Sequence, residues 1–304
     1  MEKILVTGGA GFLGSHLVYA LERENFDVVV LDDLSTGFLK NISQTRAHFI
    51  EGTVENENIV RKSAEGCGAI FHLAAMVSVP LSIENPRKCF SVNVNGTKNV
   101  IMAAEKNGIE KIVFVSSASV YGSVPKIPQR EDDETFPESP YAESKLRSEE
   151  MLSEWSKRTG GTAVSVRLFN GFGPRQRGDS QYSAVIPRFL SAALDGKPIE
   201  IFGDGEQTRD FIFVDDIVNA LLFLMKSNFS GVVNLARGEG ISILQLAEVV
   251  REIAGREIPV EFKKSRKGEV RHSVADISKL KSIGYQPEIS LKEGLKITLN
   301  SLYG

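Results

Sequence analysis

Tyr141 and Lys145, in the segment SPYAESK at positions 139–145, have the residue types and the spacing needed for proton transfer. Residues four apart on a helix lie on one face, one turn from each other. A phenol is a poor base near neutral pH because its pKa is about 10, but a neighbouring ammonium group stabilises the phenolate and lowers that pKa. A helical Tyr141–Lys145 pair can therefore take a proton from a hydroxyl group and return it.

A glycine-rich turn near the start of the chain predicts the site of a cofactor for this pair. Ile4–Val6 is an apolar run typical of a buried parallel strand, and apolar residues recur at helical spacing from position 12 to position 21. The glycines between these segments are Gly8, Gly11 and Gly14. Backbone amides at such a strand-to-helix turn can approach a pyrophosphate, which indicates a dinucleotide-binding site.

The next strand indicates which dinucleotide binds. Val28–Leu31 is apolar and ends in Asp32, where the dinucleotide fingerprint has the acid that binds the adenosine ribose. A carboxylate there repels a 2′-phosphate. The sequence therefore favours NAD over NADP.

Alternating strands and helices continue after this unit. We predict strands at His48–Ile50, Ala69–Leu73, Lys111–Ser116 and Thr162–Leu168, and helices at Asn95–Lys106 and Tyr141–Thr159. This alternation predicts an α/β fold: a doubly wound parallel Rossmann sheet with a smaller α/β substrate-binding domain. Ligands of such sheets bind beyond the carboxyl ends of the strands, where Ser117 and the helix that begins near Tyr141 are expected to meet.

The domain boundary is expected after the sixth strand. We assign residues 1–170 to the NAD-binding Rossmann domain, with 215–236 returning to it, and 171–214 and 237–304 to a second, substrate-binding domain. In the second domain Ser242 is expected to cap a helix over Ile243–Ala254, with Gly255 as its end.

Composition excludes several classes of partner. The net charge of −3 argues against a nucleic-acid partner, and no apolar stretch approaches the length of about 20 residues that spans a membrane. The N-terminus enters a strand directly, so no signal peptide is expected. Cys67 and Cys89 are expected to be reduced core residues of a cytoplasmic protein. The four histidines lack metal-ligand spacing, so no metal is predicted.

Some polar residues receive structural interpretations. His72 lies inside an apolar strand and is expected to be structural. Asp215 and Asp216 are expected to cap a helix, and Glu131–Glu134 is expected to be a solvated loop before the active-site helix.

The motifs together resemble the extended short-chain dehydrogenase/reductases, and more narrowly the UDP-hexose 4-epimerases, over essentially the whole chain. The matching stretches are Thr7–Gly14, Asp32–Gly37, Phe71–Ala75, Asn93–Thr97, Ser116–Gly122, Ser139–Lys145, Arg167–Asn170, Gly203–Gly205, Arg209–Phe211 and Arg266–Lys279. The resemblance implies that Tyr141 is the general base and acid, that Ser117 binds the sugar 4-hydroxyl, and that Lys145 holds the nicotinamide ribose and lowers the pKa of Tyr141. It also implies a homodimer, formed through a two-helix face of the first domain.

The resemblance also implies the two sets of binding residues. Those matching NAD-binding positions are Gly8, Gly11, Phe12, Leu13, Gly14, Asp32, Asp33, Ser35, Thr36, Gly37, Thr53, Val54, Leu73, Ala74, Ala75, Asn93, Tyr141, Lys145 and Phe169. Those matching substrate-binding positions are Ser78, Ser117, Asn170, Gln176, Ala184, Val185, Arg209, Arg266, Arg271 and Ser273. Thr53 is a departure, because the family usually has Asp there, in contact with the adenine amino group.

Two positions separate the possible reactions of such a protein. Related 4,6-dehydratases carry an Asp-Glu pair directly after the catalytic hydroxyl residue, and decarboxylating relatives tend to have Glu in this stretch. This chain has Ala118 and Ser119 there, which leaves epimerisation at C4. Ser273 matches a position beside sugar C2 where a small residue tends to admit an N-acetyl group. We therefore expect activity on UDP-GlcNAc/UDP-GalNAc and also on UDP-Glc/UDP-Gal. The alternatives are net NAD-linked oxidation of an alcohol, another nucleotide-sugar modification such as uronate epimerisation, and a non-catalytic NAD-binding role.

Overall fold

The computed structural model of the chain describes residues 2–123, 126–176, 184–265 and 270–302, which fall into two compact units. The first unit comprises Met1–Gly122, Glu134–Leu168 and Val218–Val233, and the second comprises Ser123–Asp133, Phe169–Ile217 and Asn234–Gly304.

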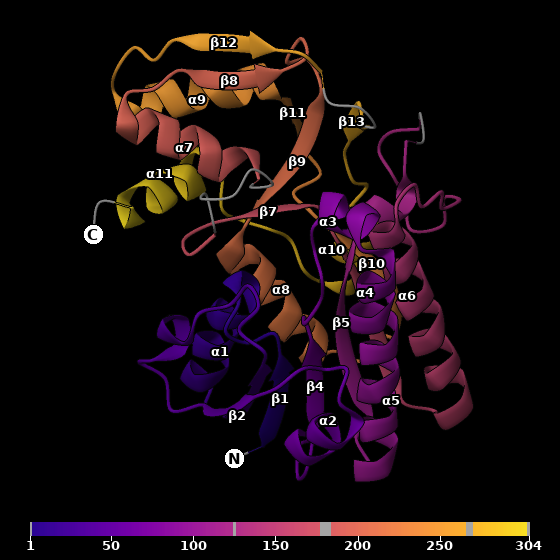
Figure 1. The fold of residues 1–304 in the computed structure, drawn as a ribbon. Coiled ribbons are helices and arrows are strands. Elements are labelled where there is room, and N and C mark those ends of the chain that lie inside the picture. Colours follow the sequence, from indigo (N-terminus) through magenta and orange to yellow (C-terminus); the bar gives the residue numbers. More distant parts are fainter. Residues whose placement is uncertain (1, 124–125, 177–183, 266–269, 303–304) are drawn as a thin grey trace. The chain divides into compact units, whose positions relative to one another are not determined.

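A seven-stranded sheet forms the centre of the first unit (Figure 1). Its strands are β1 (Lys3–Thr7), β2 (Asp27–Asp32), β3 (His48–Glu51), β4 (Ala69–His72), β5 (Lys111–Ser117), β6 (Thr162–Leu168) and β10 (Gly231–Leu235). They follow the order β10-β6-β5-β4-β1-β2-β3, and every pair from β6 to β3 is parallel. The strand order reverses at β1, where doubly wound sheets bind their ligands beyond the carboxyl ends.

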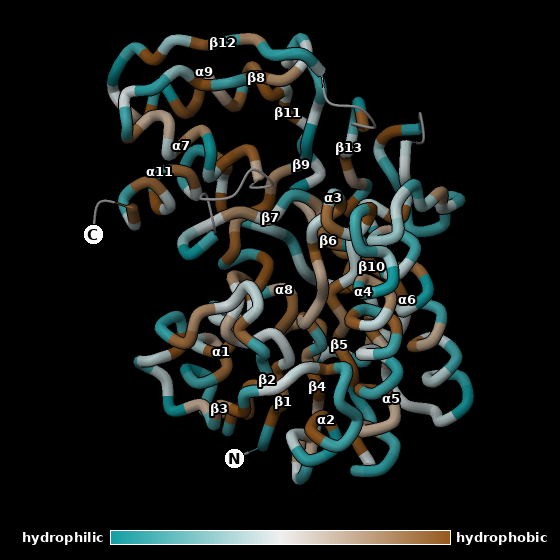
Figure 2. The backbone as a smooth tube through the Cα atoms, in the orientation of Figure 1, coloured by the Kyte–Doolittle hydropathy of each residue, from teal (hydrophilic) through white to brown (hydrophobic). Residues whose placement is uncertain are grey.

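Helices cover both faces of this sheet. The helices of the first unit are α1 (Phe12–Arg23), α2 (Glu57–Ser63), α3 (Val79–Glu84), α4 (Pro86–Phe90), α5 (Gly96–Asn107) and α6 (Pro140–Thr159), with a π-helix η2 (Ser91–Asn95), the 3-10 turns η1 (Leu39–Ile42) and η3 (Ala118–Tyr121), and most of α8 (Val214–Lys226). Alternate strand residues such as Leu5, Ile70 and Ile112 form one core with α2, α5 and α6, and α1 packs against β1 and β2. The predicted doubly wound α/β fold is confirmed, and Figure 2 shows its strands as largely hydrophobic segments.

The second unit is built around β9. Its elements are β7 (Asn170–Phe172), α7 (Val185–Asp195), β8 (Ile199–Phe202), β9 (Thr208–Phe213), β11 (Gly240–Ser242), α9 (Ile243–Ala254), β12 (Val260–Lys263), β13 (His272–Ser273), α10 (Ser278–Ile283) and α11 (Leu291–Ser301). β9 pairs with β7, β11 and β13, and β8 pairs with β12. The predicted cap is confirmed, because Ser242 and Gln245 form a reciprocal capping box and Gly255 ends the helix in the left-handed conformation. Within the described ranges, no helix is both long and apolar enough to cross a membrane.

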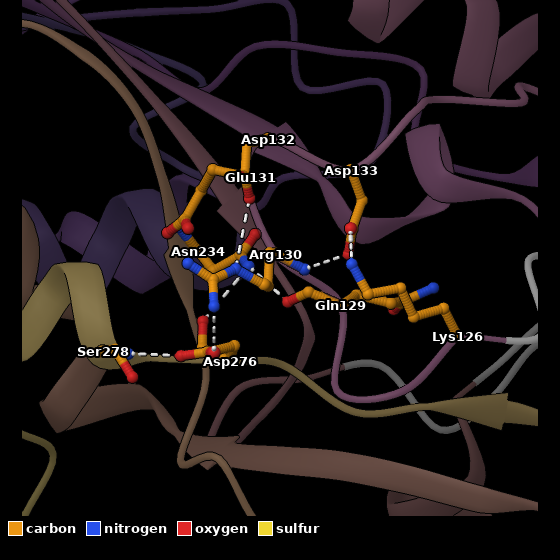
Figure 3. Close-up of polar contacts among 9 residues, drawn as sticks. All are labelled: Lys126, Gln129, Arg130, Glu131, Asp132, Asp133, Asn234, Asp276 and Ser278. Atoms are coloured by element: carbon orange, nitrogen blue, oxygen red, sulfur yellow. Dashed lines mark hydrogen bonds and ion pairs between the residues drawn. The ribbon is translucent and has the colours of Figure 1, made fainter.

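The segment Ser123–Asp133 groups with the second unit, although the sequence assigns it to the first domain. Its Gln129 amide donates to the carbonyl oxygen of Val274 at 2.8 Å, and the Asp276 amide donates to the Gln129 carbonyl oxygen at 2.8 Å. The buried Asn234 side chain donates to the same Gln129 oxygen at 2.9 Å (Figure 3). These bonds join residues more than 100 positions apart, which no local pattern reveals.

The acidic residues Glu131–Glu134 are expected from the sequence to form a solvated loop. In the structure, Glu131 and Asp133 instead bind backbone amides. A Glu131 side-chain oxygen accepts a hydrogen bond from the Asn234 amide at 2.7 Å. The Asp133 carboxylate accepts from the Arg130 amide at 2.7 Å and pairs with Lys126 (Figure 3). Glu131 and Asp133 therefore hold backbone segments of the second unit in place.

The prediction that Asp216 caps its own helix is wrong. This aspartate is 2% exposed, and its two oxygens accept hydrogen bonds from the amides of Glu288 and Ile289 at 3.0 and 2.9 Å. It satisfies the backbone before α11 rather than the first turn of its own helix.

Candidate active site

Tyr141 and Lys145 both lie on α6, which is capped by the Ser139 side chain. The predicted four-residue spacing on one helix is present. Both side chains are buried, and the Lys145 Nζ lies 5.9 Å from the centre of the Tyr141 ring. That Nζ donates to the carbonyl oxygen of Val115 at 2.8 Å and lies 4.6 Å from the centre of the Phe114 ring. Strand β5 therefore holds the ammonium group on the same side of α6 as the phenol.

Ser117 ends β5, and its side chain lies within hydrogen-bonding reach of Tyr141. The Ser117 hydroxyl also caps η3 by accepting from the Ser119 amide at 3.2 Å. The structure therefore brings together the three residues that the sequence proposes for catalysis.

Burial dominates the electrostatics of this site. It raises the pKa of Tyr141, and the hydrogen bond with Ser117 opposes that rise. Burial also lowers the pKa of Lys145 to about 8, although Cys89 and Glu149 favour its charged form. The site is thus a region of low polarity in which one further charge has a large effect on both groups.

The glycine turn is shaped by close backbone contacts. Gly8 has a φ of 73°, and a Cβ atom there would lie 2.8 Å from the amide nitrogen of Ala74. A Cβ atom at Gly14 would lie 2.0 Å from the Gly8 carbonyl oxygen. Helix α1 follows, beginning at Phe12 and Leu13 with no side-chain cap and no acidic residue in its first turn. Its free amide end fits the pyrophosphate of NAD.

Asp32 lies at the end of β2 and folds the following loop toward the glycine turn. Its carboxylate accepts hydrogen bonds from the Ala10 amide at 2.9 Å and the Leu34 amide at 2.8 Å. Burial raises its pKa, and these bonds act against that effect. Each carboxylate oxygen has a further lone pair, so Asp32 keeps the capacity to accept from ribose hydroxyls.

The rest of the proposed ribose loop stays close to the same turn. The Asp33 side chain accepts a hydrogen bond from the Ser35 amide at 3.0 Å, and Thr36 is the next residue in the loop. A Cβ atom at Gly37 would lie 2.9 Å from the carbonyl carbon of Ala10. The loop from Asp33 to Gly37 therefore lies beside the turn that fits the pyrophosphate.

The remaining cofactor residues of the first unit lie after β3 and β4. The Thr53 hydroxyl donates to Glu55 at 3.2 Å, and Val54 is buried. Leu73, Ala74 and Ala75 directly follow β4, and the Leu73 amide donates to the carbonyl oxygen of Thr7 at 3.1 Å. Within the first unit, the predicted NAD residues thus form the loops at the carboxyl ends of β1 to β4.

Asn93, on the π-helix η2, links one of these loops to the catalytic helix. Its side-chain oxygen accepts from the Met76 amide at 2.8 Å, and its side-chain nitrogen donates to the Ser144 hydroxyl on α6 at 2.8 Å. Asn93 therefore couples the position of the loop after β4 to that of Tyr141.

The buried His72 is structural, as predicted. Its Nδ1 lies 2.7 Å from the Thr7 hydroxyl and its Nε2 lies 3.0 Å from the Thr97 hydroxyl. The Thr97 hydroxyl donates to the Asn93 carbonyl oxygen at 2.6 Å, so it accepts from His72 and the Nε2 carries the proton. Burial lowers the pKa of His72 to about 3, which keeps the ring neutral.

Four of the proposed substrate residues lie together on the sheet around β9. Asn170 on β7 pairs with β9, and Ser273 on β13 is the register partner of Arg209. The Arg209 guanidinium also donates to the Arg271 carbonyl oxygen at 3.4 Å. Arg271 itself forms two hydrogen bonds with Asp204, at 2.7 and 2.9 Å.

The other proposed substrate and cofactor residues have different surroundings. The Ser78 hydroxyl caps α3 in the first unit by accepting from the Leu81 amide at 3.3 Å. In the second unit, the Gln176 side chain donates to the Gly171 carbonyl oxygen at 3.0 Å while its own oxygen is buried without a hydrogen-bond partner. Ala184 and Val185 begin α7, Phe169 is buried, and Arg266 lies outside the described residues.

A buried cluster in the first unit is absent from the predicted site residues. Glu149 on α6, Arg167 on β6 and Ser116 on β5 join their side chains. The available signal was a glutamate four residues beyond Lys145 on the predicted helix and an arginine within an apolar strand.

Cys67 and Cys89 are free and buried, as predicted, and no set of three potential ligands for a metal occurs in the described ranges.

Comparison with known proteins defines the class. Residues 4–236 match the model of the NAD dependent epimerase/dehydratase family, and the chain belongs to this family of NAD-dependent enzymes. Its relatives within the family include UDP-sugar 4-epimerases. A putative UDP-glucose 4-epimerase of Methanocaldococcus jannaschii is 37% identical over 299 residues, which cover 98% of this chain and 97% of that protein.

Solved structures agree with this assignment. A UDP-N-acetylglucosamine 4-epimerase from Methanobrevibacter ruminantium, in complex with UDP-N-acetylmuramic acid, is 36% identical with a TM-score of 0.96 and covers 99% of this chain and 98% of its own. A UDP-glucose 4-epimerase of Thermotoga maritima with UDP-glucose is 36% identical, with a TM-score of 0.94 and the same coverage. A UDP-glucuronic acid decarboxylase of Xenopus tropicalis is 33% identical over 98% of this chain and 72% of that protein.

Proposed function

We propose that the chain is an NAD-dependent 4-epimerase of UDP-hexoses, acting on UDP-GlcNAc/UDP-GalNAc and on UDP-Glc/UDP-Gal through a 4-keto sugar. The observation that carries the proposal is that the half-buried Ser117 lies within hydrogen-bonding reach of the buried Tyr141, one helical turn from Lys145. A phenol, a hydroxyl donor and a cation at one site are the groups needed to remove and return the proton of a secondary alcohol.

Each residue has a defined part in this reaction. Ser117 orients the 4-hydroxyl, Tyr141 accepts its proton and later returns one, and Lys145 stabilises the phenolate. When bound, NAD would supply the acceptor and donor of the C4 hydride, and its positive charge would favour the phenolate of Tyr141, whose pKa burial raises. The glycine turn and Asp32 would hold its pyrophosphate and its adenosine ribose.

Residues of the second unit would hold the nucleotide. Planar guanidinium groups suit a diphosphate, and Arg209 and Arg271 lie on neighbouring segments of one sheet. Ser273 is the register partner of Arg209, and its small side chain would admit an N-acetyl group where a larger one would exclude it. We expect the active protein to be a cytoplasmic homodimer.

Decarboxylation of a UDP-uronic acid is the alternative that one relative supports. Ala118 and Ser119 argue against it, since neither can act as an additional acid or base next to Ser117. The same residues argue against a 4,6-dehydratase.

The test is to incubate the purified protein with NAD and, separately, UDP-GlcNAc, UDP-GalNAc, UDP-Glc, UDP-Gal and UDP-glucuronate. Proton NMR would follow the anomeric signals, and absorbance would follow free NADH. Interconversion within each 4-epimer pair without accumulation of NADH supports the proposal. Steady NADH release indicates a net oxidoreductase, and loss of the carboxyl group indicates a decarboxylase.

Matched variants identify the acid–base group in the same assay. Tyr141→Phe keeps the ring and removes the hydroxyl, so we expect a loss of turnover of about a hundredfold or more. Tyr19→Phe makes the same change in the middle of α1 and should leave turnover unchanged. Equal turnover in both variants would remove Tyr141 from the mechanism.

A further inference from the structure

Glu149 is a buried carboxylate on the catalytic helix that the proposed reaction does not use. It lies on α6 one turn beyond Lys145 and two turns beyond Tyr141, so these three residues follow one stripe of the helix. Its side chain is 4% exposed. An ionised carboxylate at such depth requires partners, because burial without them is costly.

Two strands supply those partners. From β6, the Arg167 Nε donates to one Glu149 oxygen at 3.1 Å and the Arg167 Nη2 donates to the other at 2.8 Å. From β5, the Ser116 hydroxyl donates to the same carboxylate. One side chain of α6 is therefore bonded to both strands that α6 packs against.

The same cluster reaches both sides of Ser117. Ser116 precedes this residue in the chain, and Tyr121 follows it at the end of η3. The Arg167 guanidinium carbon lies 4.8 Å from the centre of the buried Tyr121 ring, and the guanidinium donates a hydrogen bond to the Tyr121 side chain. Movement of Glu149 would thus move the backbone on either side of the proposed catalytic hydroxyl.

Stability alone does not account for a buried ion pair at this point. Apolar side chains of similar volume serve a core equally well or better, because they avoid the loss of hydration. The cluster instead has a charge consequence for its neighbour: the Glu149 carboxylate favours the charged form of Lys145 within a buried site.

We propose that Glu149, held by Arg167 and Ser116, is a positioning residue that fixes Ser117 on β5 against Tyr141 and Lys145 on α6 and keeps Lys145 protonated. The inference rests on the proposed function. It assigns to Glu149 the support of the relative positions of Ser117, Tyr141 and Lys145 and of the positive charge of Lys145.

The charges around Lys145 and Tyr141 make the prediction specific. α4 contributes Cys89 and β4 contributes His72, and burial keeps both of these side chains neutral. β6 contributes Arg167, whose charge is compensated by Glu149. η3 contributes Tyr121, which lies against Arg167, and α6 contributes Glu149. Glu149 is therefore the group among them that bears a negative charge near neutral pH, and the Cys89 thiol favours the Lys145 ammonium only where it ionises at higher pH.

The main variant is Glu149→Gln, which keeps the size of the side chain and removes its charge. We expect kcat to fall about tenfold, with KM within about twofold, because the reacting groups are displaced while the nucleotide contacts are untouched. The alkaline limb of the kcat profile should move to lower pH by about one unit, because Lys145 loses its proton more readily. Glu150→Gln, which changes the exposed neighbour on α6, is the matched control and should leave both unchanged.

Ser116→Ala separates position from charge and serves where Glu149→Gln fails to fold. It releases β5 from Glu149 and leaves the Glu149–Arg167 pair in place. We expect a lower kcat without a shift of the alkaline limb. An unchanged kcat in Ser116→Ala would overturn the positioning role of the cluster.

A readout without substrate keeps this inference distinct from the proposed function. Nitrogen-15 NMR of lysine-labelled holoenzyme would follow the Lys145 Nζ, with its signal assigned by its absence in Lys145→Arg. The titration midpoint of Lys145 should fall in Glu149→Gln and stay constant in Glu150→Gln. A lower midpoint in a protein that turns over no UDP-hexose would refute the proposed function alone. An unchanged midpoint together with an unchanged kcat in Glu149→Gln would refute the role of Glu149.

Discussion

Asp204 and Arg271 form a two-bond ion pair in the second unit, with N–O distances of 2.7 and 2.9 Å. Arg271 is one of the residues proposed to bind the diphosphate of the substrate, and a carboxylate presents two oxygens much as a phosphate does. Both side chains are more than half exposed, so water and salt weaken the pair. Asp204 therefore holds the guanidinium in a defined place. An anion that binds Arg271 must displace this carboxylate, which costs little free energy.

The first prediction follows from this competition. Asp204→Asn releases Arg271, and we expect the Kd for UDP to fall about twofold to fivefold, because an exposed ion pair is worth up to about 1 kcal/mol. Isothermal titration calorimetry at low salt would measure it, and the difference should shrink as salt is added. Asp195→Asn, which breaks the exposed pair with Lys197 in the same unit, is the control. Weaker binding of UDP by Asp204→Asn would mean that the carboxylate orients Arg271 rather than competing for it.

The second prediction concerns substrate choice. Ser273 is the register partner of Arg209, so a bulky side chain at this position would lie next to the proposed nucleotide contacts. We expect Ser273→Tyr to lower kcat/KM for UDP-GlcNAc about tenfold or more and to change the value for UDP-Glc by less than about threefold. Ser282→Tyr on the exposed face of α10 is the matched control. An equal loss on both substrates in steady-state assays would show that the position does not select for the N-acetyl group.

The sequence predicted those parts of the fold and site that depend on neighbouring residues. The glycine turn, the acid after β2 and the helix with Tyr141 and Lys145 are all short-range patterns, and the structure has each of them. Asp216 was misassigned because its partners, the amides of Glu288 and Ile289, lie about 70 positions further along the chain.

The buried polar clusters required three-dimensional information. Arg167 appeared in a sequence motif, but its bond to Glu149 depends on the packing of α6 against β6, which no spacing along the chain expresses. The grouping of Ser123–Asp133 with the second unit likewise depends on Gln129 meeting Val274. Hydrophobic patterns determine which face of an element is buried, whereas polar partners across elements follow from the final register.

The third prediction concerns His72 and the acid stability of the first unit. In the folded chain burial lowers the pKa of His72 to about 3, from an ordinary value of 6.5. The unfolded chain therefore binds a proton that the folded chain excludes between these two values. The stability that His72 contributes is complete above pH 6.5 and is lost as pH falls toward 3, with a slope of up to about 1.4 kcal/mol per pH unit.

Urea unfolding at several pH values would measure this effect. His72→Gln can still hydrogen bond with Thr7 and Thr97, so we expect it to fold and to lose stability less steeply than the wild type below pH 6.5. The same slope in both proteins would show that the histidine does not control the acid response.

The fourth prediction has the opposite sign and concerns Asp210 in the second unit. This aspartate is fully buried on β9, and its carboxylate accepts from the amides of Arg237, Gly238 and Ala275 at 2.9, 3.0 and 3.2 Å. Burial nevertheless raises its pKa to about 6, from an ordinary value of 3.8. The folded chain therefore binds the extra proton between these values, so the stability contributed by Asp210 is complete below pH 3.8 and is lost as pH rises through 6.

Asp210→Asn tests both the charge and the hydrogen bonds of this residue. The amide cannot accept at both of its ends, so at least one backbone N–H loses its partner and we expect a loss of about 1–3 kcal/mol. That loss should be smaller at pH 7 than at pH 4, because only the wild type bears the charge of a buried carboxylate at the higher pH. Hydrogen exchange of the Gly238 and Ala275 amides, which donate to Asp210, would measure the loss at the site itself. Equal losses of protection at the two pH values would mean that Asp210 is ionised throughout and that its hydrogen bonds outweigh its burial.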